Sequence, residues 1–87
     1  MMKELVELLA RALVDRPELV DVRETEDERS IMLELRVAPA DVGKVIGRQG
    51  RTIKALRTLV HAAAIRSQKN ASLEVIDEER EARRAAE

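Results

Sequence analysis

The sequence contains no phenylalanine, tryptophan, tyrosine or cysteine. A chain without these side chains must build its core from aliphatic residues, and it has no disulfides, thiolate zinc ligands or aromatic stacking platforms. Its 87 residues allow one compact domain, and a hydrophobic content of 45% is enough for a small core. These features predict a single small domain with an aliphatic interior.

The first helix is predicted over residues 2–14, where apolar residues recur at spacings of three and four between charged ones. Pro17 ends this helix, because proline lacks the backbone donor and disfavours helical geometry in the residue before it. The side expected to face the core consists of Leu5, Leu8, Leu9, Ala12 and Leu13.

Two strands follow, at residues 20–23 and 31–37, and the second shows the clearest alternation of apolar and polar residues in the chain. The link at residues 25–29 is short and acidic, so the strands form an antiparallel hairpin with one buried face. Glu24, Glu26, Asp27 and Glu28 lack calcium-loop spacing, which favours a solvated turn over a cation site.

A short helix at residues 39–46 and a long one at 51–67 precede a last strand around Leu73 and Val75. The order is helix, strand, strand, helix, helix, strand. Two helices between the second and third strands make a right-handed crossover, which returns parallel. We therefore expect a two-layer α+β domain with a three-stranded mixed sheet and all helices on one face. The charged residues 78–87 are expected to form a frayed helix or a disordered tail.

The charge of the chain is unevenly distributed. The net charge is −1, from 16 basic and 17 acidic residues, yet residues 42–73 contain no Asp or Glu. Such a positive segment in an acidic protein is typical of a localised anion-binding surface.

Inside this segment, Gly47, Arg48, Gln49 and Gly50 separate the two predicted helices. Glycine at both ends of such a loop allows a tight reversal and lets a sugar-phosphate backbone approach closely. The N-terminus of the following helix would also favour an anion. The alternative is a corner between helices in which the glycines serve geometry only.

The run V-I-G-R-Q-G-R-T-I at residues 45–53 resembles the signature of the KH domain, a module that binds single-stranded nucleic acid. Its position between two helices, after two strands and before one, matches the type II arrangement, and the whole chain is similar to the small bacterial KhpA-like RNA-binding proteins. The resemblance assigns residues 1–77 to the KH domain and leaves 78–87 as a charged C-terminal tail.

The resemblance implies a protein that binds single-stranded RNA without catalysis, as an RNA chaperone or post-transcriptional regulator. The RNA-binding residues it implies are Lys44, Gly47, Arg48, Gln49, Gly50, Arg51 and Lys54. The bases would lie in a groove between these helices and the strand at residues 31–37. The groove floor would be Val42, Ile46 and Ile53. Packing in the hydrophobic core explains each of these three residues equally well.

The resemblance also implies a homodimer and a larger KH-containing partner tied to cell-wall growth and division. The competing interpretation is thus a dimerisation and protein-interaction module with little RNA function of its own. Ala55, Leu59 and Ala62 project away from the core side of the long helix and are candidate dimer contacts or idle surface.

No arrangement of residues in the sequence indicates catalysis, a metal site or a cofactor. His61 has no Ser or Cys partner in a recognisable arrangement, and solvated helix surface is the simpler interpretation. The chain also lacks a run of about 20 apolar residues and an N-terminal basic segment followed by an apolar one. We therefore expect a cytoplasmic protein that does not span a membrane.

Overall fold

The computed structural model describes residues 2–86, with the side chains of all of these except residues 80 and 81. Its helices are α1 (Met2–Leu13), α2 (Val42–Ile46), α3 (Arg51–Ile65) and α4 (Glu78–Ala86), and its strands are β1 (Asp21–Glu26), β2 (Ser30–Arg36) and β3 (Asn70–Ile76). Short 3-10 turns at Pro17–Leu19, Pro39–Asp41 and Arg48–Gly50 complete the chain. The predicted order of elements is confirmed.

The three strands form one mixed sheet in the order β1-β2-β3. Strands β1 and β2 pair antiparallel with Val22 opposite Leu35, and β2 and β3 pair parallel with Leu33 opposite Leu73. The parallel pairing follows from the crossover through α2 and α3, as expected. This arrangement is that of a type II KH fold, and the α+β class is confirmed.

The hairpin turn is shorter than predicted, because β1 continues to Glu26. The Oδ1 atom of Asp27 accepts the backbone N–H groups of Arg29 and Ser30, both at 2.8 Å. These backbone bonds lower the pKa of the Asp27 carboxyl. One aspartate thus organises the turn. Within residues 2–86 no group of acidic or histidine side chains is placed to hold a metal ion.

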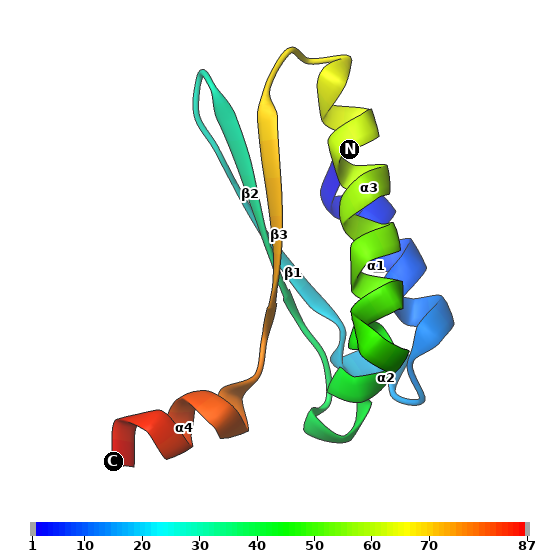
Figure 1. The fold of residues 1–87 in the computed structure, drawn as a ribbon, viewed down its shortest axis with the longest axis vertical. Helices are drawn as coiled ribbons and strands as arrows, with labels where there is room; N and C mark the ends of the chain where they lie inside the picture. Colours follow the sequence, from blue (N-terminus) through cyan, green and yellow to red (C-terminus); the bar gives the residue numbers. More distant parts are fainter. Residues whose placement is uncertain (1, 87) are drawn as a thin grey trace.

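Helices α1, α2 and α3 form one layer against one face of the sheet (Figure 1). The core between the layers is aliphatic, with Leu33 and Leu35 from β2 fully buried and Val45 and Val60 buried from the helices. Burying one such side chain stabilises a fold by about 1.5–3 kcal/mol, so the alternation along β2 decides which face is covered. The aliphatic core that the composition predicts is confirmed.

The face of α1 that packs on the sheet differs in part from the prediction: Leu9 packs against the core as expected and Leu5 is partly buried. Val6 and Ala10 are the buried residues of this helix, whereas Leu8 is 66% exposed and Leu13 is also exposed. Both sets have helical spacing, so periodicity alone could not choose between them. The smaller pair lets the helix backbone lie close to the sheet, which favours tight packing.

The expectation that all helices lie on one face is wrong for α4. Residues 78–86 form a helix rather than a disordered tail, and in Figure 1 this helix extends from the lower end of β3, away from the other helices. Glu78 accepts a hydrogen bond from the Nε of Arg36 on β2 at 3.2 Å, which ties the start of α4 to the sheet. Residue 87 of the predicted tail lies outside the described residues.

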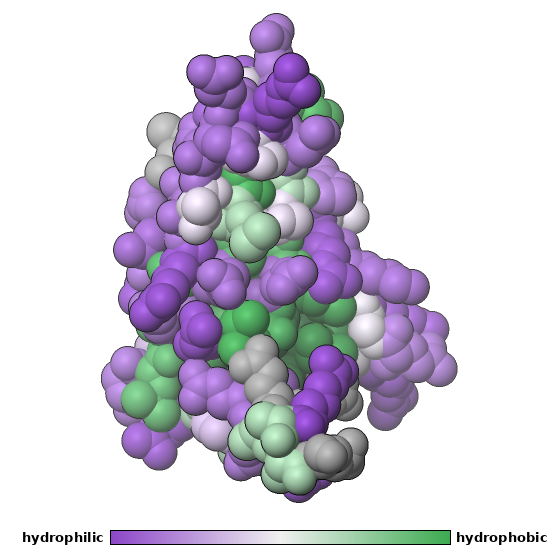
Figure 2. All heavy atoms as spheres, turned by 90° about the vertical axis from the view of Figure 1, so that its left-hand side faces the viewer, coloured by the Kyte–Doolittle hydropathy of each residue, from purple (hydrophilic) through white to green (hydrophobic). Residues whose placement is uncertain are grey.

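Figure 2 shows the face of the sheet that the three packed helices leave open. Hydrophilic residues cover most of it, and apolar residues gather in its lower half, where α4 begins. No described helix is both long and apolar enough to cross a lipid bilayer.

Candidate nucleic-acid interface

The loop between α2 and α3 has an unusual backbone. Gly47, Gln49 and Gly50 all have positive φ angles, of 78°, 58° and 72°. Glycine adopts this region without steric penalty, whereas Gln49 is a non-glycine residue in the left-handed region. The loop closes through the N–H of Gly50, which donates to the carbonyl of Gly47 at 3.1 Å.

Gly47 and Gly50 are required for different reasons. A β-carbon on Gly47 would lie 2.1 Å from the Oγ1 of Thr52 and 2.9 Å from its backbone nitrogen. A β-carbon on Gly50 would meet only the Cγ2 of Ile53, at 4.0 Å. Gly47 therefore lets the loop close on the first turn of α3, whereas Gly50 leaves open space on its surface.

Thr52, in the first turn of α3, contributes to the loop geometry in a way that the sequence did not reveal. Its side chain occupies the space where a β-carbon of residue 47 would lie, and only the structure shows this contact. The geometric interpretation of the glycines is therefore correct for Gly47. The open surface at Gly50 is compatible with close approach of a ligand backbone.

Positive charge without acidic partners surrounds the loop. The side chains of Arg48, Arg51 and Lys54 are exposed, and within the described part of the chain none of them forms a hydrogen bond or an ion pair. Gln49 is also exposed at the tip. Helix α3 begins at Arg51, whose backbone N–H donates to the carbonyl of Arg48, and the positive end of the helix dipole adds to the field of the three cations. Arg48, Gln49, Arg51 and Lys54 therefore share one exposed, positively charged surface.

Lys44 differs from these three cations because it is paired with acidic side chains. Its Nζ lies 2.9 Å from Asp15 and 3.5 Å from Asp41, and the hydrogen bond that it donates to Asp15 raises the pKa of the lysine. Two carboxylates neutralise its charge, so the structure gives no support to Lys44 as a free phosphate ligand.

Asp41 connects α2 to the end of α1. It is buried, and its Oδ2 accepts the backbone N–H of Arg16 at 3.0 Å. Burial acts to raise the pKa of Asp41, but the backbone N–H groups of Arg16 and Asp15, together with Lys44, outweigh it and lower the pKa. This ionised group fixes the start of the helix that leads into the loop.

The predicted groove residues differ in burial. Val42 and Ile46 are partly buried and can contribute apolar surface, whereas Ile53 is a buried member of the core cluster. The strand beside the two helices is also different from the one expected. Helix α3 packs most extensively on β3, the edge strand, and α2 also touches β3. A groove along these helices is therefore walled by β3 rather than by residues 31–37.

Helix α3 presents two flanks on either side of its buried face. Lys54, Arg57 and His61 follow one another at spacings of three and four, which places them on one flank. The Nε of Arg57 donates to the carbonyl of Leu73 on β3 at 3.1 Å, so this flank faces the edge strand. Arg57 is not among the RNA-binding residues that the family resemblance implies.

The candidate dimer residues lie on the opposite flank of α3. Ala55, Leu59 and Ala62 are exposed, and Leu59 retains 48% of its accessible surface. These residues lie away from Lys54 and Arg57, whereas Arg51 precedes Ala55 by one turn on the same side of the helix.

A G-x-x-G loop between two helices, on a sheet with one antiparallel and one parallel pairing, defines a KH domain of type II. The family model described as KhpA/KhpB, KH domain matches residues 3–75. The chain belongs to this KhpA/KhpB family of KH domains.

Curated relatives carry the name RNA-binding protein KhpA. The one from Clostridium perfringens is 59% identical over 75 residues, which are 86% of this chain and 100% of the relative. The relative from Halalkalibacterium halodurans is 54% identical over 76 residues, 87% of this chain and 100% of its own. The relative from Chlamydia muridarum is 47% identical over 77 residues, 88% of this chain and 99% of its own. No solved structure matches the chain significantly.

Proposed function

We propose that this protein binds single-stranded RNA through the loop Gly47–Gly50, without catalysis, and acts in the cytoplasm as an RNA chaperone or post-transcriptional regulator. The observation that carries the proposal is the group of unpaired cations around the loop, Arg48, Arg51 and Lys54, on a segment without acidic residues. The names of the relatives agree with it.

In this mechanism the loop holds the RNA backbone. The phosphates of about four nucleotides lie over the glycine loop. Arg48 and Gln49 bind them from the loop tip, and the side chains of Arg51 and Lys54 bind them from the first turns of α3, whose positive dipole end adds to the attraction. Lys44 holds α2 against Asp15 and Asp41 instead of binding phosphate. The bases point toward the partly buried Val42 and Ile46, and the absence of Phe, Trp and Tyr from the chain limits the affinity.

The test is a substitution that places negative charge on the loop without a steric collision. Gly50→Asp is suitable because space surrounds this position and aspartate tolerates the left-handed region better than most residues. Gly47→Asp is unsuitable, because its β-carbon would collide with Thr52. Fluorescence anisotropy with a labelled single-stranded RNA measures affinity, and far-UV circular dichroism confirms folding.

We expect folded Gly50→Asp to lose at least tenfold in RNA affinity, because phosphate must occupy the space that the carboxylate enters. Ala85→Asp on α4 is the matched control, because it also replaces a neutral exposed residue and adds the same single negative charge outside the loop. Unchanged affinity in folded Gly50→Asp would exclude the loop as the binding site.

The second candidate function is that of a dimerisation and protein-interaction module in the control of cell-wall growth and division, with a larger KH-containing protein as partner. The observation that favours it is the exposed Leu59, flanked by Ala55 and Ala62. Small residues around one large apolar side chain allow two helices to approach closely. Because this flank is separate from the loop, a homodimer and RNA binding are compatible.

A further inference from the structure

A hollow of about 250 Å³ lies at the end of the sheet where β1 begins and where β2 and β3 end. The apolar residues that line it are Leu19, Val37, Ala38, Pro39, Val42 and Ile76. The charged residues that line it are Asp21, Arg36 and Glu78. The hollow is large enough to admit an aliphatic side chain from another molecule.

The strand register places this hollow on the face of the sheet that α1, α2 and α3 leave open. Val22 and Leu35 are opposite each other and belong to the core between the two layers. The next row across the sheet is Asp21, Arg36 and Ile76, whose side chains therefore face the other side. Figure 2 shows that the apolar residues in the lower half of this face are bordered by hydrophilic ones. We call this site the open-face hollow.

Part of its apolar lining is not used by the core of the domain. Leu19, in the 3-10 turn before β1, retains 48% of its accessible surface and lies outside the core cluster. Pro39 is also exposed, and Val42 is only partly buried. Apolar surface gathered in a hollow and bordered by charges is typical of a site that contacts another protein.

Acidic side chains outnumber basic ones around the open-face hollow. Asp21 and Glu74 are exposed, and neither forms an ion pair among residues 2–86. Arg36 is already paired, because its Nε lies 3.2 Å from the Oε1 of Glu78. On the two rows of the sheet nearest the hollow and at the start of α4, the acidic residues are Asp21, Glu34, Glu74 and Glu78, and the basic residues are Arg23 and Arg36. This field favours a cationic ligand over the phosphates of RNA.

The family match does not account for the open-face hollow. The match ends at residue 75, whereas Ile76 and Glu78, which line the hollow, follow that residue. The hollow is therefore built in part by the segment that leads into α4.

We propose that the open-face hollow docks a basic protein segment, which inserts one aliphatic side chain flanked by lysine or arginine residues. The aliphatic side chain packs against Leu19 and Ile76. The flanking cations pair with Asp21 and Glu74. Burial of the aliphatic group supplies most of the affinity, and the charges guide the encounter and the orientation. This contact is additional to RNA binding at the glycine loop and does not depend on it.

The first experiment titrates end-blocked pentapeptides into isotope-labelled protein and follows its backbone amides by NMR. The probe is Lys-Lys-Leu-Lys-Lys, and the matched peptides are Lys-Lys-Ser-Lys-Lys and Glu-Glu-Leu-Glu-Glu. We expect the probe to shift amides within residues 19–21, 36–38 and 76–78. The serine peptide should bind at least about tenfold more weakly, because it lacks the buried leucine side chain. The glutamate peptide should bind more weakly still, because the acidic residues around the hollow repel it.

The second experiment changes the protein at two positions outside the RNA groove. Leu19→Gln should weaken binding of the probe at least about fivefold, since it removes apolar surface at a position where the fold does not need it. Leu8→Gln is its matched control, because Leu8 is an exposed leucine of α1. Asp21→Asn should weaken binding about twofold to fivefold and reduce its salt dependence, whereas Glu28→Gln in the hairpin turn should change neither.

The outcomes decide between a built site and general attraction of charge. Equal binding of the leucine and serine peptides would refute the inference, as would amide shifts that spread over the acidic hairpin and spare the hollow. Equal effects of Leu19→Gln and Leu8→Gln would also refute it. Folded Gly50→Asp should bind the probe within about twofold of the wild type, because the loop is not part of this site. A larger loss in Gly50→Asp would place the peptide at the loop and overturn the proposal.

Discussion

The different surroundings of the two loop glycines give a quantitative prediction. Both have positive φ, so replacement of either by alanine costs about 1–2 kcal/mol of backbone strain. Only at Gly47 does the new β-carbon also collide, at 2.1 Å from the Oγ1 and 2.6 Å from the Cβ of Thr52. Overpacking of this kind costs a further 1–3 kcal/mol, approximately. We expect Gly47→Ala to lower the free energy of unfolding by about 2–5 kcal/mol and Gly50→Ala by about 1–2 kcal/mol.

Urea unfolding monitored by far-UV circular dichroism measures both values, and RNA anisotropy on the same samples shows whether the loop still binds. Gly47→Ala should also lose RNA affinity, because Thr52 can make room only by moving the first turn of α3. Combining Gly47→Ala with Thr52→Gly removes both side-chain atoms from the collision and should recover at least about 1 kcal/mol relative to the sum of the single variants.

Equal destabilisation by Gly47→Ala and Gly50→Ala would refute the reasoning, because the two positions differ only in what the β-carbon meets. Additivity in the double variant would also contradict it, since it would mean that Thr52 does not occupy the space beside Gly47.

Four further outcomes are expected. The logarithm of the RNA association constant should fall with the logarithm of salt concentration at a slope near −2, because about three phosphates each release ~0.7 counterion. In salt titrations Arg48→Ala should make this slope shallower, whereas Arg83→Ala should leave it unchanged. Leu59→Arg should weaken self-association in sedimentation equilibrium, and an entirely monomeric wild type would exclude the dimer. Gln68, with a φ of 57°, ends α3 in the left-handed region, so Gln68→Gly should raise the free energy of unfolding by about 0.5–1 kcal/mol in urea titrations. The pKa of Asp41 is lowered in the folded state, so its ionised carboxylate stabilises the fold above about pH 4, and this stabilisation is lost as the pH falls through the folded-state pKa. In thermal melts at decreasing pH, the melting temperature of Asp41→Asn should therefore fall less steeply than that of the wild type.

Local patterns were sufficient to predict most of the architecture. The alternation along β2 sets which of its side chains are buried, because neighbouring residues of a strand face opposite sides. The crossover through two helices dictates the parallel pairing of β3. The glycine spacing and the absence of acidic residues in positions 42–73 located the candidate site, since both are properties of contiguous sequence.

The remaining features depend on contacts between residues distant in sequence. Periodicity could not choose Val6 and Ala10 over Leu8 and Leu13, because that choice depends on how closely α1 approaches the sheet. The sequence shows that Lys44 is basic, but only the fold brings the carboxylate of Asp15 close enough to neutralise it.

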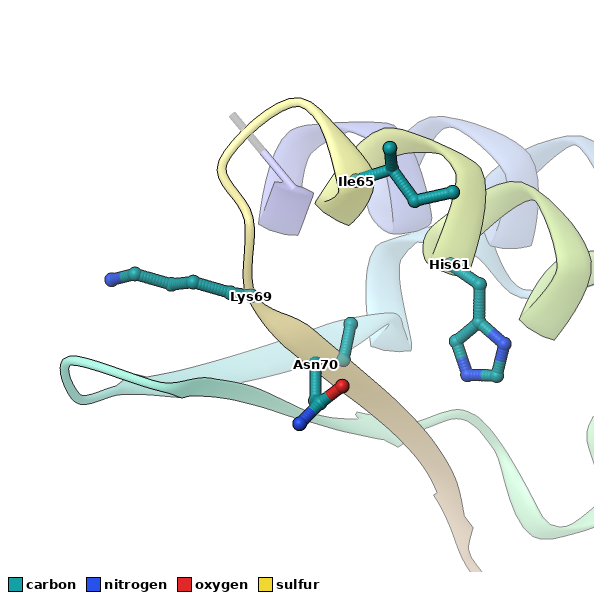
Figure 3. Close-up of a pocket in the computed structure, with 5 residues that line it drawn as sticks. His61, Ile65, Lys69 and Asn70 are labelled. Atoms are coloured by element: carbon teal, nitrogen blue, oxygen red, sulfur yellow. The ribbon is translucent and has the colours of Figure 1, made fainter.

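Tertiary structure also decided the extent of the candidate site. The sequence identified the loop because its residues are adjacent, but the wall beside it comes from β3, which the crossover returns to the sheet edge. Apart from this site, His61 of α3 and Asn70 of β3 are nine positions apart without a recognisable spacing, and they line one hollow of about 190 Å³ (Figure 3) only because α3 ends and β3 begins at the same end of the domain. Sequence thus determined which residues carry the charge, and packing determined which of them remain free to meet a ligand.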